Sequence, residues 1–125
     1  MTFGKIEKVY QPGSEELVLQ IHTRKGNVKL YASAASQAAR VCLTDGKFVN
    51  PAAPPNFCML LRKHIQTGRI TDIRQRGSER IIEMDIEAQT ELGFTVSKRL
   101  IFEIMGKHSN IVLVALDTGK IIDSI

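Results

Sequence analysis

The sequence lacks the segments that mark membrane and secreted proteins. No run of apolar residues approaches the roughly 18 that cross a bilayer as a helix. The first residues, MTFGK, have neither the apolar core nor the small-residue cleavage site of a signal peptide. We therefore expect a protein of the cytoplasm with no membrane partner.

Cysteine is scarce as well. Cys42 and Cys58 lie sixteen positions apart, and neither has a second cysteine or a histidine at the spacing of metal ligands. Both are predicted to be small buried hydrophobic residues. His22, His64 and His108 fit an exposed strand, a helix end and a turn, respectively. No metal site and no cofactor is expected.

Signatures of a catalytic site are also absent. The sequence contains no G-x-S-x-G turn, and Gly93 and Gly106 stand alone, without the spacing of a phosphate-binding loop. Glu83, Asp85 and Glu87 alternate along one strand, which is more typical of a solvated sheet face than of an acid–base pair. We therefore expect a binding protein and not an enzyme.

What is present is the composition of one soluble globular domain. The chain has 125 residues, of which 43% are hydrophobic and 24% are charged. A domain of that length buries roughly two thirds of the surface that its unfolded chain exposes. Its 17 basic and 13 acidic residues give a net charge of +4, which slightly favours a polyanionic partner.

Most of the chain alternates apolar and polar residues with the period of two that is typical of β-strands. Residues 17–21 and 28–32 form one pair of strands around RKGN, whose Gly and Asn suit a tight hairpin. Residues 82–87 and 96–104 form a second pair around the turn TELGF. Two further strands are expected at NIVLVALD and IIDSI, so the chain is predicted to be mainly β (α+β).

One stretch departs from this pattern. In NPAAPPNFCMLLRKHIQTGR, residues 50–69, apolar residues recur at intervals of three and four. Pro54 and Pro55 suit the start of a helix, and Gly68 suits the position just past its end. This predicts one flanking helix near 55–67.

Several segments together resemble one protein family. KVYQPGSEELVLQIHT, PPNFCMLLRKHIQTGRI, FEIMGKHSNIVLV and GKIIDSI occur here in the order found in the N-terminal domain of the NFACT family. These are the bacterial fibronectin-binding protein A-like proteins, which include factors of ribosome quality control. On this resemblance, residues 1–125 form one NFACT N-terminal-like domain.

The resemblance implies a fold and a function. The family's domain is a two-sheet antiparallel β-sandwich with a flanking helix, similar to the N-terminal domain of formamidopyrimidine-DNA glycosylases. Family members bind the large ribosomal subunit with a stalled nascent chain, and they recruit tRNA for alanine tailing of that chain. We therefore expect a non-enzymatic module that binds tRNA and the large ribosomal subunit.

The sequence departs from the family pattern at both ends. Family members usually begin with a helix before their first strand, whereas Gly4 here follows almost directly on Met1. They also continue beyond the position of Ile125 into a helix-hairpin-helix-like region, a coiled coil and a further RNA-binding domain. We therefore expect the chain to be a fragment of a longer multidomain protein.

The resemblance also points to a pair of residues for tRNA recognition. Family members carry an Asp-Arg pair at the start of a strand, and the matching residues in QRGSERIIEM are Glu79 and Arg80. A carboxylate accepts hydrogen bonds from exocyclic amines, whereas an arginine donates to paired acceptors or to phosphate. The longer glutamate side chain weakens the match at Glu79 more than at Arg80. The alternative is a salt bridge on a surface hairpin, worth less than about 1 kcal/mol.

A second candidate is the polar stretch inside FEIMGKHSNIVLV. Gly106 permits an unusual backbone, and the four residues after it carry hydrogen-bond donors that suit phosphate or ribose. The alternative is a structural turn in which two of them satisfy local backbone groups. The four residues are Lys107, His108, Ser109 and Asn110.

A basic track could extend this surface along the helix and the strand that follows it. The helix dipole accounts for the two helix cations without any ligand. The track comprises Arg62, Lys63, Arg69, Arg74 and Arg76.

Two other functions are open at this point. An adhesin that binds fibronectin or fibrinogen is the activity that named part of the family, although the missing signal peptide argues against it as the main role. A DNA glycosylase is suggested only by analogy of fold, and fold does not determine function. The N-terminal proline nucleophile of that enzyme family has no counterpart in Met1, Thr2 and Phe3.

Overall fold

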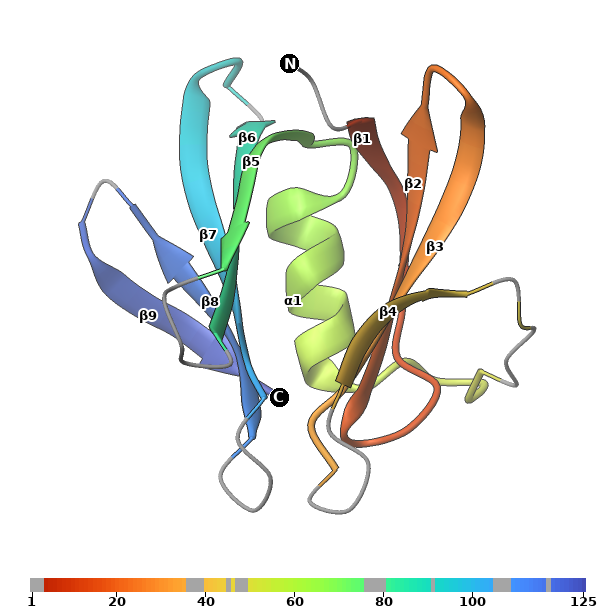
Figure 1. Cartoon of the computed structure of the whole chain (residues 1–125). Helices are drawn as coiled ribbons and strands as arrows, with labels where there is room; N and C mark the ends of the chain where they lie inside the picture. The colour runs from red at the N-terminus through yellow and green to blue at the C-terminus, as the bar shows by residue number, and fades with distance from the viewer. Residues whose placement is uncertain are drawn as a thin grey trace.

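A computed structural model describes residues 4–35, 40–44, 46, 50–75, 81–90, 92–104, 109–116 and 118–125. In this part of the chain it shows nine β-strands and one α-helix (Figure 1). None of the described helices is long and apolar enough to cross a membrane. The elements are β1 (Gly4–Tyr10), β2 (Glu16–Thr23), β3 (Gly26–Ser33), β4 (Arg40–Thr44), α1 (Asn56–Ile65), β5 (Arg69–Gln75), β6 (Ile81–Gln89), β7 (Thr95–Glu103), β8 (Asn110–Ala115) and β9 (Lys120–Ser124).

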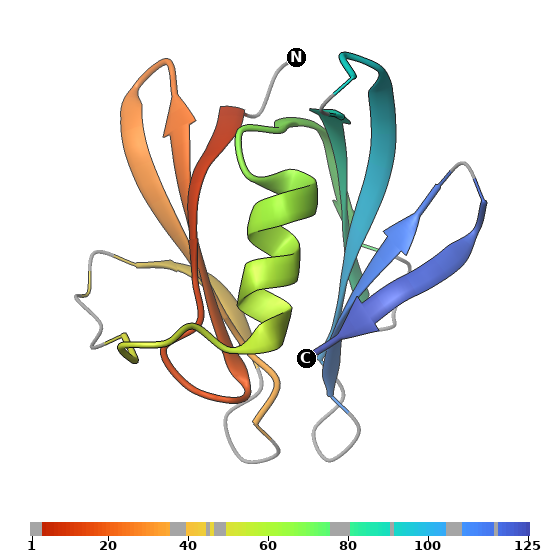
Figure 2. The same cartoon turned by 180° about the vertical axis from the view of Figure 1, so that it is seen from behind.

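The nine strands form one antiparallel sheet in the order β4-β3-β2-β1-β5-β6-β7-β8-β9. Its weakest link is at the centre, where β1 and β5 pair only through Gly4 with Ile70 and Lys5 with Arg69. The sheet therefore divides into an N-terminal wing (β1–β4) and a C-terminal wing (β5–β9). The two wings lie on opposite sides of α1 (Figures 1 and 2).

The helix fills the space between the wings. It begins after Pro55, which accepts a hydrogen bond from the backbone of Met59 but provides no side-chain cap. Its buried residues recur at the helical spacing that places them on the faces toward the wings. They are Phe57, Cys58, Leu61 and Ile65, and they pack in one core with Ile6, Leu19, Met84, Ile86, Leu100 and Phe102.

The segment between α1 and β5 ties the helix to β1. The backbone of Thr67 donates to Ile6 O at 2.8 Å, and Ile6 N donates to Gly68 O at 2.9 Å. Thr67 adopts a φ of 70°, which is unusual for a residue with a β-branched side chain. A Cβ atom on Gly68 would lie 2.7 Å from Ile86 Cγ2 and 2.8 Å from Ile65 O, so this position has no room for a side chain.

We expect Gly68→Ala to lower the free energy of unfolding by about 2–3 kcal/mol, because the added methyl group overpacks the helix against the C-terminal wing. Urea denaturation followed by circular dichroism measures the loss. Gly93→Ala is the matched control, since Gly93 has a φ of +85° but open space around it. That control should cost only about 1 kcal/mol, and equal losses for the two variants would contradict the argument.

The mainly β fold, both predicted hairpins and the helix near 55–67 are confirmed. The division into two separate sheets is not confirmed, because the pairing of β1 with β5 makes the hydrogen-bonded ladder continuous. The similarity to the glycosylase N-terminal domains stays a prediction. Burial is confirmed for Cys58 and wrong for Cys42, which is exposed on the edge strand β4.

Candidate nucleic-acid interface

The C-terminal wing brings together the strand ends that flank both candidate loops. Gln75, the last residue of β5, pairs with Ile82, while Ile81, the first residue of β6, pairs with Glu103 at the end of β7. Glu103 in turn pairs with Asn110, the first residue of β8. Neighbouring strands lie about 4.8 Å apart, so these ends fall within roughly 15 Å of one another. We call this region the loop end.

The structure describes only part of the predicted site. Asn110 is half-buried, and its Oδ1 atom accepts a hydrogen bond from the backbone N–H of Ile111 at 2.9 Å. Asn110 therefore satisfies a local backbone group, as the structural alternative expected. Ser109 is half-buried beside it. The other candidates at the loop end lie outside the described residues, namely Arg76, Glu79, Arg80, Lys107 and His108.

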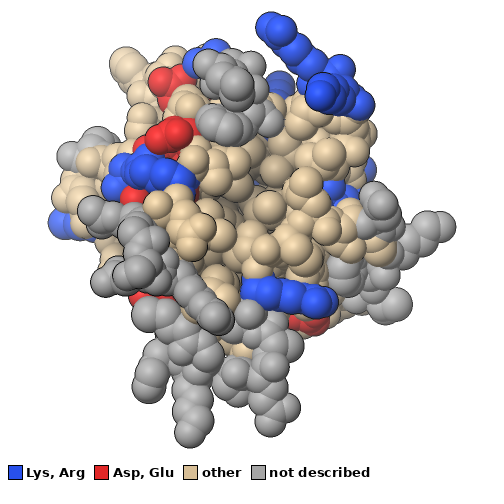
Figure 3. Space-filling model, viewed as in Figure 1, with Lys and Arg blue, Asp and Glu red and all other residues tan. Residues whose placement is uncertain are grey.

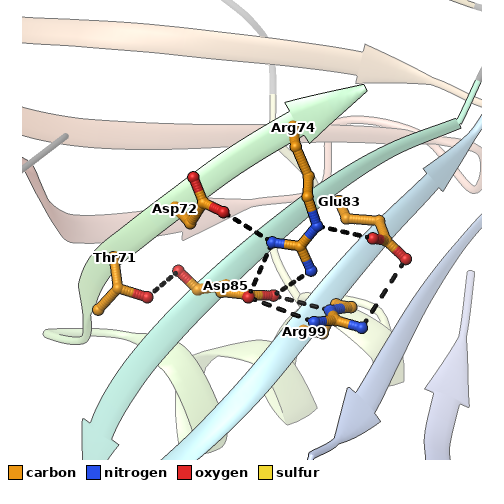
Figure 4. A network of polar contacts seen from close by, with 6 residues as sticks. All are labelled: Thr71, Asp72, Arg74, Glu83, Asp85 and Arg99. Carbon is orange, nitrogen blue, oxygen red and sulfur yellow. Dashed lines mark hydrogen bonds and ion pairs between the residues drawn. The ribbon is translucent and has the colours of Figure 1, made fainter. Parts of the chain in front are cut away.

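Next to the loop end, the outer face of β5, β6 and β7 carries a cluster of two arginines and three carboxylates (Figure 4). Arg74 donates from Nε to Glu83 at 3.0 Å, and from one terminal nitrogen to Asp72 at 2.8 Å and Asp85 at 3.0 Å. Arg99 donates from Nε to Asp85 at 2.7 Å. We call these five residues the arginine–carboxylate cluster.

The strand register explains why this cluster needs its arginines. Asp72 and Asp85 lie directly opposite each other on β5 and β6, an arrangement of like charges that is unfavourable unless a cation lies between them. Arg74 provides that cation. Glu83, opposite Arg74, is only 5% exposed, so its carboxylate has little water to solvate it. The prediction of a solvated carboxylate face is therefore wrong for Glu83.

The pKa values of the cluster follow from the same contacts. Partial burial by itself raises the pKa of Asp85, but the hydrogen bonds and charges of Arg99 and Arg74 outweigh it, so the pKa lies below its ordinary value of 3.8. The hydrogen bond to Asp85 raises the pKa of both Arg74 and Arg99. Asp85, Arg74 and Arg99 are therefore charged at neutral pH.

Replacing Arg74 with Met should lower the free energy of unfolding by about 2–3 kcal/mol at pH 7, because Glu83 and the Asp72–Asp85 pair lose their main cation. Chemical denaturation measures the change. Lys8→Met is the control, since Lys8 is exposed on β1 and has no ion pair among the described residues, and its effect should stay within about 0.5 kcal/mol.

The loss caused by Arg74→Met should depend on pH. Because the pKa of Asp85 is lowered in the folded protein, its stabilisation is complete above the ordinary value of 3.8 and is lost as the pH falls through the lowered value. The difference between the two proteins should therefore shrink in acid. A difference that is the same at pH 7 and in strong acid would show that the ion pairs are not its source.

The four described members of the basic track lie in different settings. Arg62 donates from Nε to Val9 O at 3.0 Å, and Lys63 is exposed without an ion pair among the described residues. Arg69 pairs with Glu87 at 2.7 Å at the opposite end of β5 from Gln75. Arg74 belongs to the arginine–carboxylate cluster. Each of these three arginines therefore has a different structural partner.

Sequence reasoning overlooked Arg99, although the signal was available. In the predicted hairpin of residues 82–87 with 96–104, Arg99 lies directly opposite Asp85. Cross-strand pairs of opposite charge are common on exposed sheet faces.

Within the described residues, no group of three or more His, Cys, Asp and Glu side chains could hold a metal ion.

The geometry defines a class of protein: a mainly β domain whose two wings enclose one helix and whose candidate loops emerge at one end. The whole chain, residues 1–125, matches the family described as NFACT N-terminal and middle domains. The chain therefore belongs to the NFACT family.

Relatives from two bacteria and one archaeon support this assignment. The chain is 44% identical over 122 residues to the Rqc2 homolog RqcH of Streptococcus suis and 41% identical to that of Bacillus subtilis, covering 98% of this chain in both cases. It is 26% identical over 118 residues to the archaeal Rqc2 homolog aRqcH of Methanocaldococcus jannaschii, covering 92% of this chain and 17% of that protein. The chain covers 22% and 21% of the two bacterial relatives, about a fifth of their length.

Solved structures show the same fold. The N-terminal part of the fibronectin/fibrinogen-binding protein from Streptococcus suis superposes with a TM-score of 0.94 at 44% identity, over 97% of this chain and 45% of that chain. The N-terminal domain of the fibronectin-binding protein PavA from Streptococcus pneumoniae gives a TM-score of 0.95 at 42% identity, over 97% and 46% of the two chains.

Proposed function

We propose that this domain is a tRNA- and large-ribosomal-subunit-binding module of a cytoplasmic ribosome quality-control factor that supports alanine tailing of stalled nascent chains. One observation carries the proposal: in a chain this similar to RqcH, the sheet register attaches both candidate loop segments to the same end of one wing. On this proposal the domain binds and positions RNA and performs no bond chemistry itself.

The strand that follows Arg80 is held rigidly. Arg80 is bonded to Ile81, and two residues further on Glu83 enters the arginine–carboxylate cluster. Because Arg80 is covalently attached to this strand, we expect it to lose less conformational entropy on binding than an arginine far from any strand. A guanidinium donates two parallel hydrogen bonds to phosphate or to a base edge. In this proposal Glu79, Lys107, His108, Ser109 and Asn110 supply the neighbouring contacts.

Arg80→Ala should weaken tRNA binding by about 1–3 kcal/mol, which corresponds to roughly fivefold to 150-fold in Kd. Fluorescence anisotropy with labelled tRNA at one fixed salt concentration measures the change. Arg80→Lys should recover only part of the affinity, because lysine keeps the charge but not the planar pair of donors.

Lys8→Ala is the control for this experiment, since it removes one exposed cation from the other wing and leaves the net charge equal to that of Arg80→Ala. Its Kd should change by less than about twofold. Equal losses of tRNA affinity for the two variants would mean that the effect comes from net charge, and Arg80 would then not be part of the binding site.

A second candidate is binding of fibronectin or fibrinogen, favoured by the descriptions of the solved relatives. The structure offers a route for a protein partner, because β4 and β9 are edge strands that carry the exposed side chains of Leu43 and Ile121. Saturable binding of the folded domain to immobilised fibronectin that is insensitive to salt and lost in Leu43→Lys would support it. Binding that disappears at high salt would reflect only the basic charge.

A further inference from the structure

Three hollows of about 250, 520 and 430 Å³ lie at the end of the molecule opposite the loop end. The first and second share Lys5 and Arg69, at the pairing of β1 with β5, on the outer face of the sheet. The third opens on the inner face beside α1, and it meets the second at Gln89 on β6. We call these three hollows together the junction groove.

The junction groove is far from the proposed tRNA site. β7 begins with Thr95, which lines the second hollow, and ends with Glu103 at the loop end. At about 3.3 Å per residue these positions lie roughly 27 Å apart. The groove is therefore separate from the strand ends that flank the candidate loops.

Positive charge dominates the described lining of the groove. Among the described residues that line it, Glu87 is the one carboxylate, and it pairs with Arg69 at 2.7 Å in an exposed ion pair that is worth less than about 1 kcal/mol. Lys and Arg atoms project over the β2–β3 hairpin at the upper right of Figure 3. The cations of the lining are Lys5, Arg24, Lys63, Arg69 and Lys98.

Lys98 is the most informative of these cations. It pairs with Ile86 on the inner side of the C-terminal wing and is only 9% exposed, yet it has no hydrogen bond or ion pair among the described residues. It lines the third hollow together with Lys63 and His64. Burial of a lysine without a carboxylate is unfavourable unless its ammonium group reaches solvent or an anion through such a hollow.

The pKa of His64 is affected by the same two lysines. Burial lowers its pKa, and the positive charges of Lys98 and Lys63 lower it further. The third hollow therefore holds two cations and one neutral imidazole. An anion bound there would relieve the repulsion between the two lysines.

The tip of the β6–β7 hairpin adds a stacking surface at the edge of the groove. Leu92 is 83% exposed and Phe94 is 66% exposed. The tip is held by hydrogen bonds from Thr90 N to Phe94 O at 2.8 Å and from Phe94 N to Thr90 Oγ1 at 3.2 Å. Leu92 lines the third hollow, and Phe94 precedes Val96 and Lys98, which share one face of β7. An exposed aromatic ring near cations is a combination by which proteins hold unpaired nucleic acid.

We propose that the junction groove binds the phosphodiester backbone of an unpaired RNA segment, with Lys63 and Lys98 on phosphates and Phe94 stacked on a base. An acidic peptide fits less well, because it would use the cations but leave the exposed ring without a partner. The groove is a second RNA contact, independent of base sequence, and it does not depend on Arg80. An RNA that reaches both ends of the domain would be held at two separated points.

The test uses this chain and a fluorescein-labelled oligouridylate of about 15 nucleotides, titrated at several salt concentrations. Lys63→Ala combined with Lys98→Met should weaken binding by about tenfold or more at roughly 50 mM salt and reduce the slope of log K against log salt by about 1.4. Methionine keeps the buried stem of Lys98, so the fold is retained. Phe94→Ala should weaken binding by about fivefold or more without changing the slope.

Matched controls separate this proposal from the previous one. Lys8→Ala with Lys120→Ala removes two exposed cations outside the groove and should leave the affinity for oligouridylate within about twofold. Arg80→Ala should also leave it unchanged, since oligouridylate lacks the folded shape of tRNA. A loss confined to tRNA in Arg80→Ala, with no effect of the groove variants, would overturn the groove and leave the tRNA site intact.

Nuclear magnetic resonance provides a readout inside the groove. Bound phosphate should raise the pKa of His64 by offsetting the charges of Lys63 and Lys98, so its ring signals should titrate at higher pH with oligouridylate than without it. Three results would overturn the proposal: an unchanged His64 titration, no saturable binding below about 100 µM RNA, or equally strong competition by poly-L-glutamate.

Discussion

The whole arrangement depends on the narrow link between the two wings of the sheet. β1 and β5 share only two residue pairs, and the same point is reinforced by hydrogen bonds from Thr67 and to Gly68. A link this short cannot by itself fix the angle between the wings. The buried face of α1 does so by packing against both, and a side chain at Gly68 would push the helix away. The positions of the loop end and of the junction groove follow from this packing.

The described basic residues divide into those that support the fold and those without a partner in it. Arg62 bonds a backbone carbonyl of β1, and Arg74 and Arg99 neutralise carboxylates that the register places side by side. Lys63 and Lys98 have no such partner among the described residues. A net charge of +4 therefore does not show how charge is distributed: in the described part of the chain Arg62, Arg74 and Arg99 have partners within the fold, whereas Lys63 and Lys98 remain for an anionic partner.

The candidate site was proposed from short stretches of sequence, and its role in binding stays a prediction. Family resemblance pointed to Arg80, and the hydrogen-bond donors after Gly106 pointed to the stretch that includes Asn110. The register shows that the strand ends flanking both stretches adjoin. The burial of Glu83 could not be predicted from alternation alone, since it depends on which arginine lies across the next strand. Lys98 was missed for the same reason: within β7 it is an ordinary polar residue, and only the neighbouring helix end makes it a buried cation.

By itself, the sequence determined the hairpins and the helix. Their signals are the apolar periods of two and 3.6 residues and the placement of Gly and Pro, which depend on only a few neighbouring residues. It did not reveal β4 or β5, nor that the pairing of Gly4 with Ile70 joins both wings into one sheet. Only the tertiary structure decided these, since strand pairing across a long sequence separation depends on packing against α1. The junction groove exists for the same reason: its lining comes from five strands and a helix that meet only in the folded chain.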